Sequence, residues 1–174
     1  MERTLEPRDI VRYFPYGLKI KMPNFIGEIN TFSPINNDFT LAYMYSTTDW
    51  RPFKFMGTRH KPILRPISDL YRTITHNGKE IIPIVELAKI AEPKQAWEFK
   101  EEVAVCEHLI SFIYDERKEV QAFCLLNYDL EIPCFVCNQY QLFDYMNELK
   151  IDYRNLIGAG LAIDCNTLEN NPYK

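Results

Sequence analysis

Glycine is scarce in this chain of 174 residues, which contains only six. No glycine-rich loop of the kind that cradles phosphates in nucleotide-binding enzymes is present, and Gly158-Ala159-Gly160 follows a predicted helix instead of opening one. The three histidines, His60, His76 and His108, lack the spacing of a helical metal site, and no Gly-x-Ser-x-Gly nucleophile motif occurs. We therefore expect a protein without catalytic activity and without a cofactor.

Long hydrophobic runs are also missing. No stretch approaches the roughly 18 apolar residues of a membrane helix, and the first seven residues lack the apolar segment of a signal peptide. Hydrophobic residues make up 47% and charged residues 25%, which is typical of soluble globular proteins and excludes a disordered chain. We expect a soluble, cytoplasmic protein that does not bind membranes.

The five cysteines are an odd number in a chain without an export signal, which favours free buried thiols over a disulfide framework. Cys134-Phe135-Val136-Cys137 alone has the spacing of a known site. A structural zinc ion needs four ligands, and Cys106, His108, Cys124 and Cys165 supply no second pair at matched spacing.

A thioredoxin-type dithiol requires a helix that starts inside the motif, whereas the helix here is predicted to start just after Cys137. We favour burial of both thiols in the core. A metal or dithiol site at Cys134 and Cys137 is kept as the alternative.

The net charge of -4 argues against a strongly basic nucleic-acid binder. Residues 1–72 contain 11 Lys and Arg against 7 Asp and Glu, a net charge of +4, and the remaining 102 residues contain 9 against 17, a net charge of -8. We favour an uneven scatter of solvated charges. The alternative is a dipolar surface that orients a partner or a second copy of the chain.

The pattern along the chain predicts one α+β domain over residues 1–174, with a strand-rich basic part (1–72) and an acidic part (73–174). Leu18, Ile20 and Met22 alternate with lysines as in a half-buried strand, and two further strands are expected over 26–32 and 39–46. Asn77-Gly78 is a strong turn signal, and Pro83 begins a helix.

Periodicity does not decide between helix and strand for residues 94–113. The choice for these residues stays open. We predict a hairpin in which the charged break 115–118 joins the runs 109–114 and 120–126. Asn138 is expected to cap a helix and Asp152 a second one, so the mainly antiparallel sheet is followed by two C-terminal helices, a last short strand and a frayed end.

Basic and aromatic residues interleave after Trp50, as they do in proteins that follow a phosphate backbone while bases stack on aromatic rings. A proline-rich edge strand guarded by charged side chains has the same composition, and we favour it. Nucleic-acid binding through residues 50–72 is the alternative. Its candidate residues are Arg51, Lys54, Arg59, Lys61 and Arg65.

Three segments resemble uncharacterised small proteins encoded in bacterial prophages and mobile elements. They are Tyr13-Phe14-Pro15-Tyr16-Gly17-Leu18-Lys19-Ile20, Lys61-Pro62-Ile63-Leu64-Arg65-Pro66-Ile67-Ser68-Asp69-Leu70, and Gln141-Leu142-Phe143-Asp144-Tyr145 followed by Asp152-Tyr153, Leu156-Ile157 and Gly160-Leu161-Ala162-Ile163-Asp164. The resemblance implies a small cytoplasmic protein of phage origin. It implies no catalytic residues, and it favours the two-helix tail and the hairpin.

Taken together, these features predict a non-enzymatic accessory protein of a prophage or mobile element. We expect it to act through contact with a protein partner or a second copy of itself. Nucleic-acid binding and a metal or dithiol site are the two alternatives.

Overall fold

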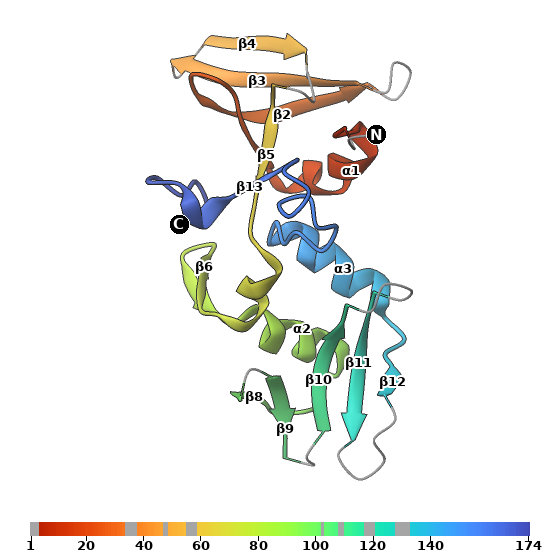
Figure 1. Ribbon diagram of the computed structural model, residues 1–174. Coiled ribbons are helices and arrows are strands. Elements are labelled where there is room, and N and C mark those ends of the chain that lie inside the picture. Colours follow the sequence, from red (N-terminus) through yellow and green to blue (C-terminus); the bar gives the residue numbers. More distant parts are fainter. Residues whose placement is uncertain are drawn as a thin grey trace. The chain divides into compact units, whose positions relative to one another are not determined.

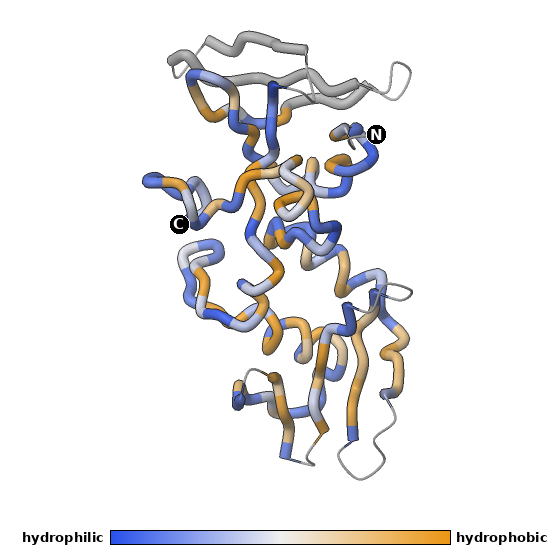
Figure 2. The backbone as a smooth tube through the Cα atoms, viewed as in Figure 1, coloured by the Kyte–Doolittle hydropathy of each residue, from blue (hydrophilic) through white to orange (hydrophobic). Residues whose placement is uncertain are grey.

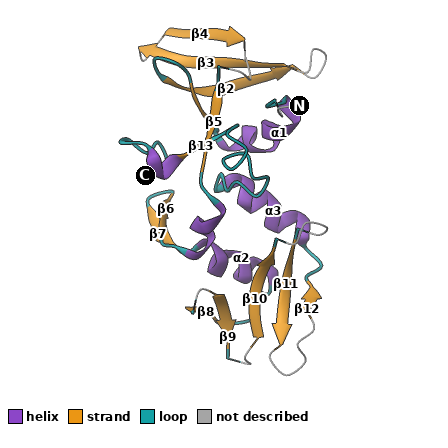
Figure 3. Ribbon diagram, in the orientation of Figure 1, coloured by secondary structure: helices purple, strands orange, loops and turns teal. Residues whose placement is uncertain are grey.

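The computed structural model describes residues 4–33, 38–46, 49–54, 59–101, 103–107, 110–116, 121–127 and 133–174, with side chains described except in 30–33, 38–46 and 49–54. Within these ranges the chain is an α+β protein in which short helices accompany mainly antiparallel sheets (Figure 3). The predicted fold class is confirmed. No described helix is long and apolar enough to cross a membrane.

The chain forms two compact units. Unit 1 combines residues 1–67 with residues 147–173, and unit 2 comprises residues 68–146 together with Lys174. Unit 1 contains 12 Lys and Arg against 10 Asp and Glu, a net charge of +2, and unit 2 contains 8 against 14, a net charge of -6. Unit 1 is therefore basic and unit 2 acidic, as the two parts of the sequence are, although residues 147–173 of the acidic part belong to unit 1.

Unit 1 is built on a six-stranded sheet with the strand order β13-β5-β1-β2-β3-β4 (Figure 1). Its strands are antiparallel, except that β13 runs parallel to β5. The strands are β1 (Lys19–Lys21), β2 (Ile26–Ser33), β3 (Asp38–Ser46), β4 (Asp49–Lys54), β5 (Lys61–Leu64) and β13 (Ile163–Asp164).

The predicted alternation is present in β1. Leu18, Ile20 and Met22 are buried, whereas Lys19 and Lys21 are only half-buried. The expected edge strand is β4, which tolerates Pro52 because an edge strand leaves half of its backbone donors outside the ladder. β5 lies inside the sheet, between β13 and β1.

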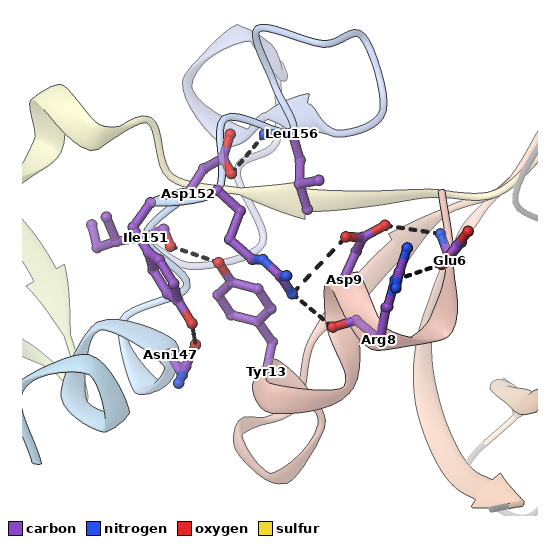
Figure 4. A network of polar contacts seen from close by, with 10 residues as sticks. Glu6, Arg8, Asp9, Tyr13, Asn147, Ile151, Asp152 and Leu156 are labelled. Atoms are coloured by element: carbon purple, nitrogen blue, oxygen red, sulfur yellow. Dashed lines mark hydrogen bonds and ion pairs between the residues drawn. The ribbon is translucent and has the colours of Figure 1, made fainter. Parts of the chain in front are cut away.

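The N-terminal helix α1 (Pro7–Ile10) and the 3-10 helix η1 (Val11–Tyr16) are joined to the tail segment of unit 1 by polar contacts (Figure 4). The Tyr13 hydroxyl donates to the Ile151 carbonyl over 2.8 Å, and both residues are buried. Arg154 donates to the Arg8 carbonyl over 2.7 Å and lies 3.9 Å from the Asp9 carboxylate. These contacts link residues more than 130 positions apart in the sequence.

The prediction of a second C-terminal helix is wrong, because residues 153–160 form turns. Asp152 does supply the expected cap, since its carboxylate accepts hydrogen bonds from the backbone N–H groups of Leu156 at 2.9 Å and Ile157 at 2.7 Å (Figure 4). Gly160 ends the turns in the left-handed region, at φ 70°. A capping side chain satisfies the first backbone N–H groups of a segment whether or not a regular helix follows, and here turns follow.

The expectation of a frayed tail is also wrong. The Tyr173 hydroxyl lies between β1 and β5, where it accepts a hydrogen bond from the Lys19 backbone N–H (3.1 Å) and donates one to the Ile63 carbonyl (2.8 Å). Arg65 donates to the Tyr173 carbonyl over 2.9 Å. The tail is therefore anchored to the sheet of unit 1.

Unit 2 begins with the 3-10 helix η2 (Ile67–Tyr71), which starts one residue before the unit boundary, and the hairpin of β6 (Ile74–His76) and β7 (Lys79–Ile81). Asn77 and Gly78 form its turn with φ values of 50° and 74°, as a type I′ turn requires. Helix α2 (Pro83–Ala91) begins at its proline and buries Ile84, Leu87 and Ala88. The turn and the helix were both predicted.

The second sheet has the strand order β12-β11-β10-β9-β8, and all its neighbours are antiparallel. The pairing of β10 with β11 confirms the predicted hairpin, and residues 97–100 and 103–106, for which the sequence left helix or strand open, are strands. Apolar residues follow one another along α2, β10 and β11 (Figure 2). The elements are β8 (Trp97–Lys100), β9 (Val103–Cys106), β10 (Ile110–Asp115), β11 (Ala122–Asn127), β12 (Pro133–Phe135) and helix α3 (Gln139–Glu148).

Candidate functional site

One face of the unit 2 sheet is covered by helices and carries an aromatic core. Phe112 on β10 stacks on Phe123 on β11 with 5.4 Å between ring centroids. Phe143 of α3 meets the Phe123 ring edge-on at 5.5 Å. The Trp97 indole N–H donates to the Glu92 carbonyl at the end of α2. Both α-helices of unit 2 therefore pack on this face.

The register of the strands defines the opposite face. Val105, Ser111, Leu126 and Pro133 are paired in one row across β9, β10, β11 and β12. Two residues further along β10, a second row contains Ile113, Cys124 and Phe135. Side chains of both rows point away from the aromatic core, because neighbouring residues of a strand point to opposite faces.

We name this surface the apolar sheet face and define it by the six apolar members of the two rows. An antiparallel sheet that is open to water on one side usually carries polar residues there. Here charged residues occur only at the margins. The six members are Val105, Ile113, Cys124, Leu126, Pro133 and Phe135.

Within the apolar sheet face, exposure is greatest at the β12 margin. Cys124 is buried, and Val105, Ile113, Leu126 and Pro133 are half-buried. Phe135 is 52% exposed and is one of three large hydrophobic residues exposed within the described part of the chain.

The outer edge of β12 offers little to another strand. The Val136 N–H donates to the Phe123 carbonyl, so Cys134 also directs its backbone groups toward β11, and those of Pro133 and Phe135 point outward. Pro133 has no N–H to donate. We therefore do not expect a strand of a partner to pair with this edge.

The start of α3 is fixed to this margin by two amide side chains. Gln139 donates to the Phe123 carbonyl at 2.6 Å and accepts from the Phe123 N–H at 2.9 Å. Asn138 occupies the predicted capping position, where its carbonyl accepts from Gln141 and Leu142, and its side chain donates to the Ile90 carbonyl. These hydrogen bonds hold the start of α3 against β11 and α2.

The prediction that both thiols of the Cys134–Cys137 pair are buried is wrong. Both cysteines are exposed, whereas Cys106, Cys124 and Cys165 are buried as expected, and none of the five forms a disulfide. Cys134 is paired with Leu125 and so lies on the same side of the sheet as Phe112, but it is on the edge strand β12. Cys137 lies in the turn before α3.

No group of three or more His, Cys, Asp or Glu side chains in the described part of the chain is arranged to hold a metal ion. His60 is buried, and burial, aided by the neighbouring Arg59, lowers its pKa. The His76 ring meets the Tyr145 ring edge-on at 6.4 Å. His108 lies outside the described residues.

The structure separates the five residues predicted to bind nucleic acid. Arg51 and Lys54 lie on β4, and Lys61 on β5 is four strand positions away in the sheet, or about 19 Å at ordinary strand spacing. Arg59 is exposed in the turn before β5. Arg65 is only 4% exposed, and its guanidinium lies 5.7 Å from the centre of the Tyr173 ring, so it does not belong to an open surface.

Sequence reasoning missed the apolar sheet face. The sequence of β10 and β11 is apolar at successive positions, so apolar side chains lie on both faces of these strands. From the sequence alone, this pattern predicts a sheet that is buried on both faces. Comparison with family models, curated proteins and solved structures finds no match for the chain.

Proposed function

We propose that the protein is a non-enzymatic accessory protein, of prophage or mobile-element origin, that binds a protein partner through the apolar sheet face of unit 2. The observation that carries this proposal is the exposed phenyl ring of Phe135 at the margin of a sheet face made of apolar residues. Aromatic anchors surrounded by half-buried apolar residues are typical centres of protein interfaces.

Charge favours a partner of different composition over a second copy of unit 2. The net charge of unit 2 is -6, so two such units brought face to face repel each other. We therefore expect the partner to present an apolar patch surrounded by lysine and arginine side chains. The face is four strands wide, about 19 Å, and about 14 Å long in the strand direction. This area of about 270 Å² is well below the roughly 800 Å² per partner of a standard interface. Contacts outside the face complete the interface.

The Phe135 ring sets the expected energy. Burying the exposed half of a phenylalanine side chain removes about 100 Å² from water, which stabilises the complex by about 2.5 kcal/mol. Phe135→Ser should therefore weaken binding by roughly 50-fold. Tyr140→Ser is the matched control, because Tyr140 on α3 is 83% exposed and lies outside the face.

The experiment places a photo-crosslinking amino acid at position 135, and separately at position 140, in cells that express the full chain. The adduct formed at 135 is identified by mass spectrometry, and its affinity for the purified protein is then measured with both serine variants. Crosslinking at 135 to a basic-rimmed protein, with affinity lost only in Phe135→Ser, supports the proposal. An adduct of two copies of this chain, no adduct at 135, or equal loss in both variants contradicts it.

A further inference from the structure

Lysine residues gather on one face of the unit 1 sheet where β1 meets β5. Lys19 and Lys21 alternate with the buried Ile20, so their side chains share the face opposite to it. Lys61 is paired directly opposite Lys21 across the two strands. Lys61 is exposed, and Lys19 and Lys21 are half-buried.

This arrangement is unfavourable in the isolated protein. Like charges directly opposite each other on neighbouring strands repel. Lys19 forms an ion pair with Glu28 of β2, but Lys21 and Lys61 form none with the described part of the chain. A pair of lysines, one exposed and one half-buried, without an ion-pair partner in the described part of the chain gains from a bound anion.

Two more cations lie at the Tyr173 ring and add to the positive electrostatic potential near Lys19. The Lys150 ammonium lies 5.5 Å and the Arg65 guanidinium 5.7 Å from the centre of the Tyr173 ring, whose hydroxyl bonds to the Lys19 backbone. Burial lowers the pKa of Lys150 most, and the positive charges of Arg65 and Lys19 lower it further, against the opposing effect of Glu148. Glu28, the ion-pair partner of Lys19, also opposes this lowering.

We propose that Lys19, Lys21 and Lys61, supported by Lys150, form a nucleic-acid binding site that contacts the phosphate backbone. Lysine is depleted in protein interfaces, whereas it is a principal contact for nucleic-acid phosphates. Ile26 is paired opposite Lys21 and is 36% exposed, which places one apolar side chain beside the lysines for sugar or base contact. A face on which three lysines lie with a single carboxylate, Glu28, and one apolar neighbour fits a phosphate backbone better than an acidic protein or a lipid surface.

This site differs from the one that the sequence suggested. It shares Lys61 with that set, and it adds Lys19 and Lys21, which sequence analysis assigned to a strand without assigning a function. It also lies in unit 1, so it is independent of the apolar sheet face of unit 2.

The test measures fluorescence anisotropy of labelled single strands and duplexes of roughly 20 nucleotides over about 50 to 200 mM salt, a range in which phosphate contacts are weakened strongly. The full chain is compared with Lys21→Gln/Lys61→Gln. The control is Lys79→Gln/Lys94→Gln, which removes the same charge from exposed positions of unit 2. A third variant, Arg51→Gln/Lys54→Gln/Arg59→Gln, tests the sequence hypothesis.

The expected result is salt-dependent binding whose log–log slope falls in magnitude by roughly 1.4 for single strands, or 1.8 for duplexes, in Lys21→Gln/Lys61→Gln, and stays unchanged in the control. Four results would overturn the assignment. They are no binding at the lowest salt, an equal loss in the control, a loss confined to the third variant, and tighter binding to polyglutamate or phosphatidylserine vesicles with the same dependence on Lys21 and Lys61.

Discussion

The Tyr173 hydroxyl substitutes for a missing link between two strands of unit 1, and its removal is a direct test of the tail anchor. β1 and β5 are paired at Ile20 with Pro62 and at Lys21 with Lys61. One residue further along, the Lys19 N–H and the Ile63 carbonyl are both bonded to the phenol oxygen, over 3.1 Å and 2.8 Å. Tyr173→Phe keeps the ring and deletes both hydrogen bonds.

The expected cost is about 2 kcal/mol of unfolding free energy. Each ordinary hydrogen bond contributes about 1 kcal/mol, and a buried backbone group left without a partner costs about 1 to 3 kcal/mol. We take the lower part of that range, because the two strands can close slightly toward each other. The Phe side chain retains the ring contacts with Arg65 and Lys150, so the loss reports on the hydroxyl.

Urea unfolding followed by circular dichroism measures the change in the unfolding free energy of the protein. Amide hydrogen exchange measures the loss of protection at the Lys19 N–H. Faster exchange at Lys19 is expected in Tyr173→Phe. Tyr140→Phe is the matched control, because the exposed Tyr140 should change the unfolding free energy by less than about 0.5 kcal/mol. Unchanged stability together with unchanged protection of the Lys19 amide would refute the anchor.

The same hydroxyl predicts a pH dependence. Burial is the main cause that raises the pKa of Tyr173 above its ordinary value of 10.0. Above pH 10 the unfolded chain loses this proton while the folded chain retains it, so folding stability falls as the pH rises. Stability curves of the wild type and Tyr173→Phe should therefore converge at alkaline pH, whereas parallel curves would show that the phenol titrates normally.

Two further substitutions test local structure by urea unfolding. Asp152→Ala should cost about 2 to 3 kcal/mol, because it removes the buried acceptor of two backbone N–H groups, and Glu169→Ala at an exposed site should cost nothing measurable. A small effect of Asp152→Ala would mean that the turns form without their cap. Gly78→Ala should cost about 1 kcal/mol from its φ of 74° alone, since the added methyl group meets no atom within 4 Å. Asn77→Gly, at the neighbouring position with φ 50°, should be neutral, and equal costs at the two positions would contradict a purely conformational origin.

Local signals predicted the elements of both units well. Proline at the start of α2, Asn77-Gly78 at the hairpin and the alternation around Ile20 each act through residues within a few positions of one another. Such short-range preferences are encoded in the sequence wherever the residues stand. The α+β class, the hairpin of β10 and β11 and the short helices follow from them, whereas the strands at 97–100 and 103–106 were left undecided.

The tail shows where local signals were insufficient. Asp152 carries the capping chemistry of a helix, but its segment forms turns, in a region where Ile151 accepts a hydrogen bond from Tyr13. The polar residues at the end of the chain suggested fraying, but Tyr173 is held by β1 and β5. The partners of Tyr173 are more than 100 positions away in the sequence.

The candidate sites depend on the tertiary structure in the same way. Alternation placed lysines on one side of β1, but only the pairing of β1 with β5 brings Lys61 opposite Lys21. Likewise, only the register of β10, β11 and β12 aligns Ile113, Cys124 and Phe135 on one face, and leaves Cys134 exposed at an edge. The sequence determined which segments form strands and helices, because those preferences act between neighbours. The choice of strand partners required burial of side chains and pairing of backbone groups across the whole sheet, and that choice decided which side chains meet at a surface.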